Sequence, residues 1–255
     1  GPVIGVTGSN GKTTVKELIA RILNVGGPAL ATAGNLNNDI GVPLTLFRLQ
    51  PEHRAAVCEM GANHPEEIAY LAAIARPDVG LVTNASAAHL EGFGSIEGVA
   101  RAKGEMFAGL AADGTAVVNA DDRYAGLWRQ LSGERRIVSF GIDAPADVRA
   151  RDIAAAGSAA TGFELCTPAG DVPLRLPLPG RHNVMNALAA AAACLAAGIS
   201  LDDVRAGLES ATAISGRLRV ASALNGATLI DDCYNANPGS ARAAIDTLAA
   251  SEGRG

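Results

Sequence analysis

The residues best suited to chemistry lie near the start of the chain, in the run Gly8-Ser9-Asn10-Gly11-Lys12-Thr13-Thr14. The run follows an apolar stretch, Val3–Thr7, and opens a helical pattern over Thr13–Val25. In this order, glycines let backbone N–H groups surround a polyphosphate, a lysine adds positive charge and a hydroxyl can bind Mg²⁺. The usual spacing has another glycine where this chain has Val6, and an ordinary glycine-rich turn is the alternative. The strand–loop–helix context favours a phosphate-binding loop.

Three further residues with reactive side chains lie at the end of an expected strand, after another strand and in an expected helix. Glu59, in Glu59–Asn63, ends an apolar strand, and a carboxylate at that position is suited to Mg²⁺, although a surface or capping glutamate is the alternative. His89 follows another strand, which favours a site over the structural role usual for a lone histidine. Lys103 lies in a helical pattern, where a solvated surface lysine is the alternative.

Two polar segments add candidate ligand contacts. The segment Gly34–Gly41 is dense in short polar groups and is either a solvated turn or part of a binding site. The segment His182–Asn186 opens a helix, so the asparagines Asn183 and Asn186 can both point at a ligand.

The elements expected to position these residues alternate along the first half of the chain. Strands are predicted at Val3–Thr7, Ala55–Glu59, Val79–Thr83, Ala116–Asn119 and Ile137–Phe140, and helices at Thr13–Val25, Pro65–Ile74, Ile96–Leu110 and Asp122–Leu131. This alternation predicts an α/β fold, a mostly parallel sheet flanked by helices, with ligands at the carboxyl ends of the strands.

The pattern changes in the second half. Short alternating runs at Gly162–Thr167 and Val172–Leu176 predict a small antiparallel hairpin, followed by helices at Asn183–Ala197 and Leu201–Leu208. After Gly216, strands at Arg219–Ala223 and Thr228–Asp231 and a helix at Ser240–Ala250 are expected. Two strands and one helix are too few for an independent core, so they predict the start of a truncated second α/β domain.

Composition limits the function classes. The chain has 255 residues, 48% of them hydrophobic and 18% charged, so a sizeable buried core is expected. A net charge of −5 gives no general attraction to nucleic acid or anionic membranes. The four cysteines, Cys58, Cys166, Cys194 and Cys233, are far apart and predict reduced thiols in a cytoplasmic protein. The most apolar run, Ala187–Ala197, is shorter than the roughly 20 residues of a membrane span.

Taken in order, these motifs resemble those of the Mur ligase family, ATP-dependent amide-forming enzymes of bacterial peptidoglycan synthesis. The resemblance rests on the phosphate loop, Glu59, His89, Lys103, His182–Asn186, Gly216-Arg217 and Asp231-Asp232. Within the family, the segments Gly34–Gly41, Glu59–Asn63, His89–Ser95 and Tyr234–Pro238 are most similar to those of the ligases that add D-alanyl-D-alanine. Another Mur-type or folylpolyglutamate-type ligase, or a nucleotide-binding module without ligase activity, are the alternatives.

The resemblance implies the substrates and the domain organisation. The substrates would be ATP, UDP-N-acetylmuramoyl-tripeptide and D-alanyl-D-alanine, joined through an acyl phosphate, and the protein would be a monomer. Residues 1–215 would be the central ATP-binding domain and residues 216–255 the first part of a C-terminal domain, with the N-terminal UDP-binding domain absent. The chain by itself is then expected to bind ATP without completing ligation.

The resemblance also implies roles for single residues. Lys12 would contact the β- and γ-phosphates, and Thr13 would hold the Mg²⁺ shared with ATP. Glu59 and His89 would hold a second Mg²⁺, and Lys103 matches a lysine that some family members carry as a carbamate beside the metal. The remaining matches concern binding: Gly8–Thr14, Asn183, Asn186, Arg217 and Asp232 to the nucleotide, and Asn35, Asn63, Tyr234 and Asn235 to the other substrates.

Overall fold

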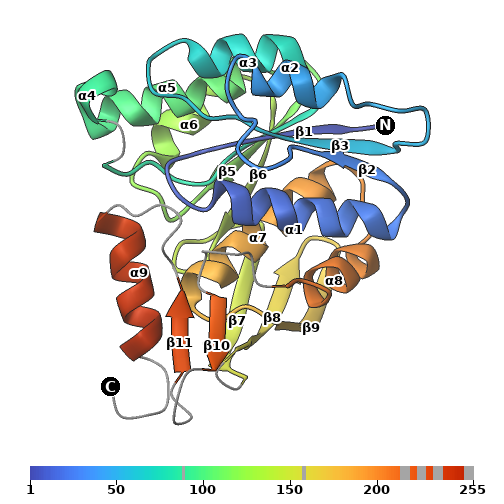
Figure 1. The fold of residues 1–255 in the computed structure, drawn as a ribbon, viewed down its shortest axis with the longest axis vertical. Helices are drawn as coiled ribbons and strands as arrows, with labels where there is room; N and C mark the ends of the chain where they lie inside the picture. The colour runs from blue at the N-terminus through green and yellow to red at the C-terminus, as the bar shows by residue number, and fades with distance from the viewer. Residues whose placement is uncertain (88–89, 157–158, 213–218, 223–227, 232–237, 250–255) are drawn as a thin grey trace.

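The computed structural model describes residues 1–87, 90–156, 159–212, 219–222, 228–231 and 238–249 (Figure 1). Within these residues a nine-stranded sheet has the order β2-β3-β1-β4-β5-β6-β7-β8-β9. The first seven strands in this order are parallel, and β8 and β9 complete the sheet in antiparallel pairing. Their bounds are β1 Val3–Thr7, β2 Ala29–Ala31, β3 Ala55–Glu59, β4 Val79–Val82, β5 Thr115–Asn119, β6 Arg136–Gly141, β7 Val148–Ala155, β8 Thr161–Thr167 and β9 Gly170–Leu176.

Helices cover both faces of the sheet (Figure 1). One face carries α1 (Lys12–Val25), α7 (Arg181–Ala196) and α8 (Leu201–Glu209), and the other carries α3 (Glu67–Ala75), α5 (Ile96–Ala108) and α6 (Ala125–Leu131). Two short helices, α2 (Gly41–Leu46) and α4 (Leu90–Phe93), lie on the side of α3 and α5. The sheet is therefore buried on both sides, as a parallel sheet requires.

Side chains along each strand point alternately to the two faces of the sheet, so the core is divided into two clusters. In β1, Ile4 and Val6 pack with α1 and α7, whereas Gly5 faces Met106 of α5, to which a Cβ at position 5 would come within 3.0 Å. The cluster under α5 also holds Phe107 and Trp128, both fully buried. Burial of each such side chain contributes about 1.5–3 kcal/mol, so the two clusters hold the strand ends in fixed positions.

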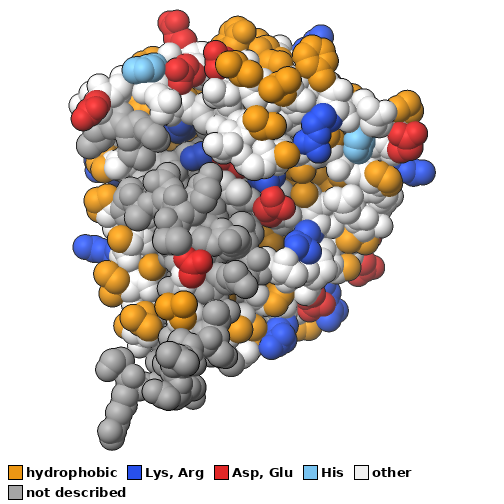
Figure 2. Space-filling view, viewed as in Figure 1, with side chains coloured by type: hydrophobic (Ala, Val, Ile, Leu, Met, Phe, Trp, Pro, Cys, Tyr) orange, Lys and Arg blue, Asp and Glu red, His pale blue; other side chains and the backbone are white. Residues whose placement is uncertain are grey.

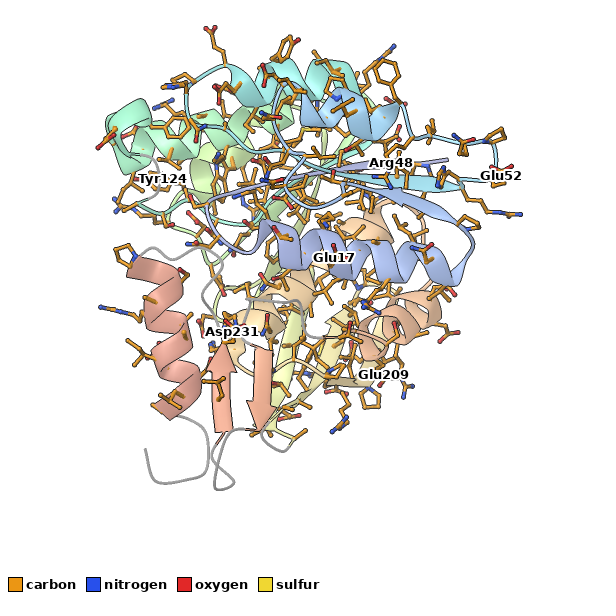
Figure 3. All side chains as sticks on the ribbon, viewed as in Figure 1. Glu17, Arg48, Glu52, Tyr124, Glu209 and Asp231 are labelled. Carbon is orange, nitrogen blue, oxygen red and sulfur yellow. The ribbon has the colours of Figure 1, made fainter. Side chains whose placement is uncertain are left out.

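The C-terminal part forms a separate small sheet. β10 (Arg219–Ser222) pairs antiparallel with β11 (Thr228–Asp231), and α9 (Pro238–Ala249) follows. Figure 3 shows Asp231 at the end of β11 that points toward the larger sheet unit. Hydrophobic side chains gather on the surface over α2 and α3, where Leu44 and Tyr70 are exposed (Figure 2). In the described ranges, no helix is both long and apolar enough for a membrane span.

The predicted fold class is confirmed, and the predicted strands of the first half and the β8–β9 hairpin are present. Two strands and two helices were not predicted: β2, β7, α2 and α4. Helix α6 begins three residues later than predicted, at Ala125, because the Asp122 carboxylate accepts the N–H of Tyr124 (2.8 Å) and holds a turn there. Helix α3 begins at Glu67 rather than Pro65, since Glu66 has a left-handed φ of 69°.

Candidate active site

A cavity of about 1250 Å³ lies at the carboxyl ends of β1, β3 and β4. Its wall combines four parts of the chain: the phosphate loop, the segment after β2, the segment after β3 and the start of α7, with α9 closing one side. The residues that line it and that the sequence singled out are Gly8, Ser9, Asn10, Gly11, Lys12, Thr13, Asn35, Glu59, Asn63, Lys103, Asn183 and Asn186. The topology therefore brings most of the predicted groups to one place.

The phosphate loop needs glycine at two positions. Gly8 has a φ of 140°, and a Cβ there would lie 2.0 Å from Thr83 Oγ1. Gly11 has a φ of 81° at the N-terminus of α1, and a Cβ there would lie 2.5 Å from Asn186 Oδ1. Both positions are thus closed to side chains by conformation and by space. The N-terminus of α1 is then placed to form an anion site, because the N–H groups of a first helical turn point along the helix axis toward such a ligand.

The loop is held in shape by the residues that follow β4. Ser9 N–H donates to the Asn84 carbonyl (3.0 Å) and Asn10 N–H donates to Asn84 Oδ1 (3.0 Å). Thr83 Oγ1 donates to the Asn10 carbonyl (2.7 Å), and Ser86 N–H donates to Ser9 Oγ (3.0 Å). Lys12 Nζ donates to the Gly8 and Ser9 carbonyls, at 2.8 and 3.2 Å, so its ammonium lies over the loop. The cation is placed where phosphate oxygens would bind.

Glu59 is a buried carboxylate with one satisfied oxygen. Its exposed fraction is 2%, and its Oε1 accepts a hydrogen bond from Asn37 Nδ2 (2.9 Å). Its Oε2 is buried and has no hydrogen-bond partner among the residues the structure describes. A bare carboxylate oxygen at the wall of a polar cavity is the donor type that Mg²⁺ prefers. The residues present therefore fit a magnesium ion here.

Lys103 reaches the same wall from α5. It is 2% exposed, its Nζ donates to the Ala62 carbonyl (3.3 Å), and the ammonium lies 5.4 Å from the centre of the Phe93 ring. Burial, and next the positive charge of Lys12, lower the pKa of Lys103 from 10.5 to about 7, against opposing effects of Glu67 and Glu105. A large fraction of this amine is thus uncharged near neutral pH.

Another side of the cavity is formed by the start of α7. The Asn183 side chain is buried, its Nδ2 donates to the Pro179 carbonyl (2.7 Å), and its Oδ1 accepts from Asn186 Nδ2 (3.3 Å). Burial lowers the pKa of His182 to about 4, so this imidazole is neutral at pH 7. Helix α9 packs on this end, since a Cβ at Gly180 would lie 2.7 Å from Thr247 Oγ1.

The other predicted site residues are placed as follows. Asn35 and Asn63 line the cavity, and Asn63 N–H donates to Glu67 Oε2 (2.6 Å). Thr14 is buried and is not part of the cavity wall. Five predicted residues lie outside the part of the chain that the structure describes: His89, Arg217, Asp232, Tyr234 and Asn235. The expected meeting of Glu59 and His89 therefore stays a prediction.

Several residues of the site were not singled out from the sequence. Asn37 holds Glu59, and Ile142, Arg181 and Met185 line the cavity. Asn37 lies in the polar segment Gly34–Gly41, but its partner Glu59 is 22 residues away in the sequence, so no local pattern connects the two residues. Ile142 follows β6 directly, and its position after a strand was the available signal.

The chain is similar to known proteins in sequence and in fold. Residues 6–194 match the family described as the Mur ligase middle domain. The chain is 51% identical, over 248 residues, to UDP-N-acetylmuramoyl-tripeptide–D-alanyl-D-alanine ligase of Escherichia coli (strain K12), covering 97% of this chain and 55% of that relative. The chain thus spans about half the length of the curated relatives it matches.

Two solved structures are similar over nearly the whole chain. A crystal structure of MurF from Acinetobacter baumannii superposes with a TM-score of 0.95 at 44% identity, covering 99% of this chain and 55% of that one. MurF ligase from Thermotoga maritima, solved in complex with ADP, has a TM-score of 0.86 at 30% identity, covering 98% of this chain and 57% of that one. Since the family match extends over most of the sequence, this chain belongs to the Mur ligase family.

Proposed function

We propose that this chain is the ATP-binding core of a ligase that adds D-alanyl-D-alanine to UDP-N-acetylmuramoyl-tripeptide. The names of its relatives support this assignment, at 51% identity for the Escherichia coli ligase. The observation that carries it is one cavity lined by both a phosphate loop and Glu59, whose buried Oε2 has no hydrogen-bond partner among the described residues. An ATP-dependent ligase needs a polyphosphate site next to a site where a substrate carboxylate is activated.

The reaction has two steps. An oxygen of the substrate carboxylate attacks the γ-phosphorus of ATP, the bond to the β,γ-bridging oxygen breaks, and ADP leaves. The amine of D-alanyl-D-alanine then attacks the acyl carbon, and phosphate leaves as the amine proton is lost. The first step converts a poor leaving group into a good one, and the protein's part is positioning and charge stabilisation.

The phosphate loop and Lys12 would hold the triphosphate. The N–H groups at the start of α1 would bind its oxygens, and the Lys12 ammonium would move from the Gly8 and Ser9 carbonyls to the β- and γ-phosphates. Thr13 would supply an oxygen ligand to the Mg²⁺ shared with ATP, and Glu59, together with His89, would hold a second Mg²⁺. When bound, Mg²⁺ neutralises phosphate charge and orients the substrate carboxylate.

Lys103 is proposed to act as a carbamate. Its pKa of about 7 leaves enough uncharged amine for attack on carbon dioxide, which yields a carbamate and a proton. The product is an anion in place of a cation, at the same wall as Glu59. The side chain would then share in holding a metal ion instead of repelling it.

The remaining assignments follow the family resemblance. Asn183, Asn186, Arg217 and Asp232 are proposed to bind ATP, and Asn35, Asn63, Tyr234 and Asn235 to contact the other substrates. Residues 1–215 are proposed as the central domain and residues 216–255 as the start of the C-terminal domain. We also propose that the protein is a monomer and acts in the cytoplasm, where ATP and UDP-linked precursors are available.

Nucleotide binding is tested by calorimetric titration of the 255-residue chain with Mg-ATP. Lys12→Ala is expected to weaken binding at least about tenfold, since charged hydrogen bonds contribute about 1.5–3 kcal/mol. Arg101→Ala is the control, because it removes the same charge from an exposed pair with Glu97 on α5. Equal affinity in the wild type and Lys12→Ala would rule out the phosphate loop.

Ligation is tested in a chimera. This chain replaces the matching 248-residue segment of the Escherichia coli relative, to which it is 51% identical. Formation of the pentapeptide product, followed by mass spectrometry, with loss of product in the chimera carrying Lys12→Ala, is the expected result. A chimera that binds ATP and forms no product would instead favour a nucleotide-binding module.

A further inference from the structure

The end of β5 and the turn after it, Asn119-Ala120-Asp121-Asp122, have no part in the proposed function above. The Asp121 carboxylate accepts three backbone N–H groups of the turn after β6: Ile142 at 2.7 Å, Asp143 at 3.1 Å and Ala144 at 2.7 Å. A Cβ at Gly141 would lie 2.7 Å from Asp121 Oδ1, so the two turns are in direct contact. One carboxylate therefore fixes the backbone of this second turn.

The turn held by Asp121 forms part of the cavity wall. Ile142 lines the cavity, and the Asp143 carboxylate accepts a hydrogen bond from Arg181 Nη2 (2.5 Å). Arg181 is the first residue of α7 and also lines the cavity. Asp121 thus connects the turn after β6 with the start of α7 through a continuous series of polar contacts.

The neighbouring residues hold a different part of the site. Asn119 Nδ2 donates to the Thr83 carbonyl (2.8 Å), and Asp122 Oδ2 accepts the N–H of Ala85 (2.9 Å). The segment from Thr83 to Ser86 is the one that anchors the phosphate loop. Two adjacent carboxylates therefore support two different ends of one cavity.

The distance between these ends suits a nucleotide. Asn186 lies against Gly11 of the phosphate loop, whereas Arg181 is five residues earlier on α7, about 7 Å away along the helix axis. With phosphates on the loop, the nucleoside would extend toward Arg181 and Ile142. Ile142 and Met185 add apolar surface there, which matches the flat face of a base.

We propose that Asp121 is a positioning residue for the nucleoside end of the site and that Asp122 is a positioning residue for the phosphate end. The inference rests on the proposed binding of ATP. Replacing Asp121 should weaken binding of ligands that carry a nucleoside and leave binding of a bare diphosphate unchanged. Replacing Asp122 should weaken both.

The test compares Mg-ADP with Mg-pyrophosphate, each titrated into the wild type, Asp121→Asn and Asp122→Asn. In Asp121→Asn, an NH₂ group must face a backbone N–H, so we expect about tenfold weaker ADP binding, with pyrophosphate binding within about twofold of the wild type. In Asp122→Asn, we expect both ligands to weaken by similar factors. Asp147→Asn is the matched control, because Asp147 accepts from Ser139 N–H (2.8 Å) and Oγ (2.6 Å) in the same β6–β7 connection without lining the cavity.

A merely structural role for Asp121 would change both ligands alike or neither, and either result would overturn the inference. Circular dichroism and thermal melting establish that each variant is folded. If Asp121→Asn does not fold, Gly141→Ala replaces it, since its methyl group would displace the Asp121 carboxylate. The inference then requires weaker ADP binding and unchanged pyrophosphate binding in Gly141→Ala. If the wild type binds ADP and the Asp121 variant has the same ratio of ADP affinity to pyrophosphate affinity as the wild type, only this inference is refuted. A wild type that binds neither ligand refutes the proposed function as well.

Discussion

Replacing Lys103 by methionine should change how the stability of the protein depends on pH. The pKa of Lys103 falls from 10.5 to about 7 on folding, mainly because its side chain is 2% exposed. Each pKa unit corresponds to about 1.4 kcal/mol, so the lysine costs the folded state about 4 kcal/mol at pH 7 and about 2 kcal/mol at pH 9. Between these pH values the unfolded chain binds more protons than the folded chain, so this group makes stability rise with pH.

Methionine has a similar length and no charge, so Lys103→Met should be more stable than the wild type at pH 7. The hydrogen bond to the Ala62 carbonyl and the contact with the Phe93 ring are lost, which reduces the gain by about 1–2 kcal/mol. The more decisive quantity is the difference between the two proteins, which should shrink by about 2 kcal/mol from pH 7 to pH 9. Titrating groups that do not interact with Lys103 cancel in that difference.

The assay is urea unfolding in buffers free of carbon dioxide, at half-unit steps from pH 6.5 to pH 9.5. A difference between wild type and Lys103→Met that does not change with pH would refute the reasoning. Adding bicarbonate at pH 8 is a second arm. If Lys103 forms a carbamate, bicarbonate should stabilise the wild type and leave Lys103→Met unchanged, because a group that binds only the folded state stabilises it.

Three further predictions concern the site and the packing beneath it. Glu59→Gln should leave ATP affinity within about threefold of the wild type but raise the Mg²⁺ concentration needed for ATP hydrolysis by at least about tenfold, and an unchanged Mg²⁺ requirement would remove Glu59 from the metal site. Gly8→Ala should weaken Mg-ADP binding and also lower the melting temperature, since its φ is 140° and its Cβ would meet Thr83 Oγ1; calorimetric titration and thermal melting measure the two effects. Gly207→Ala should lower the free energy of unfolding by about 1–3 kcal/mol, because its Cβ would lie 2.4 Å from Ile22 Cα between α8 and α1; urea unfolding with no change would contradict this close packing.

The fold was predictable where one periodic signal dominated. The strands β1, β3, β4, β5 and β6 are mostly apolar runs, and a parallel sheet buried on both faces requires such runs. Strand β2, Ala29–Ala31, is too short to give a pattern and forms by pairing with β3. Strand β7 carries exposed arginines and an irregular register with β8 between Arg151 and Ala154, so its alternation is broken.

The candidate site was predictable residue by residue only where each residue carried its own signal. Lys12 follows the loop after β1 and Glu59 is the last residue of β3, so both could be assigned to one edge of the sheet before any distance was known. The contacts that support these residues could not be predicted, because each joins segments that are distant in the sequence. Asn37 contacts Glu59, and Asp121 contacts the turn at Ile142. Such pairs depend on the strand order, and the sequence does not state that β3 lies beside β1 or that β5 lies between β4 and β6.

The site reduces stability in return for fixed geometry, and the core offsets this loss. Glu59 has a buried oxygen without a partner among the described residues, and Lys103 is a buried amine whose desolvation costs about 4 kcal/mol at pH 7. Burial of two large apolar side chains, such as Phe107 and Trp128, supplies a similar amount. Because the strand ends are held by two such clusters, the polar groups cannot relax into better contacts with each other. They remain placed for ligands that supply the missing charge, as preorganised catalysis requires.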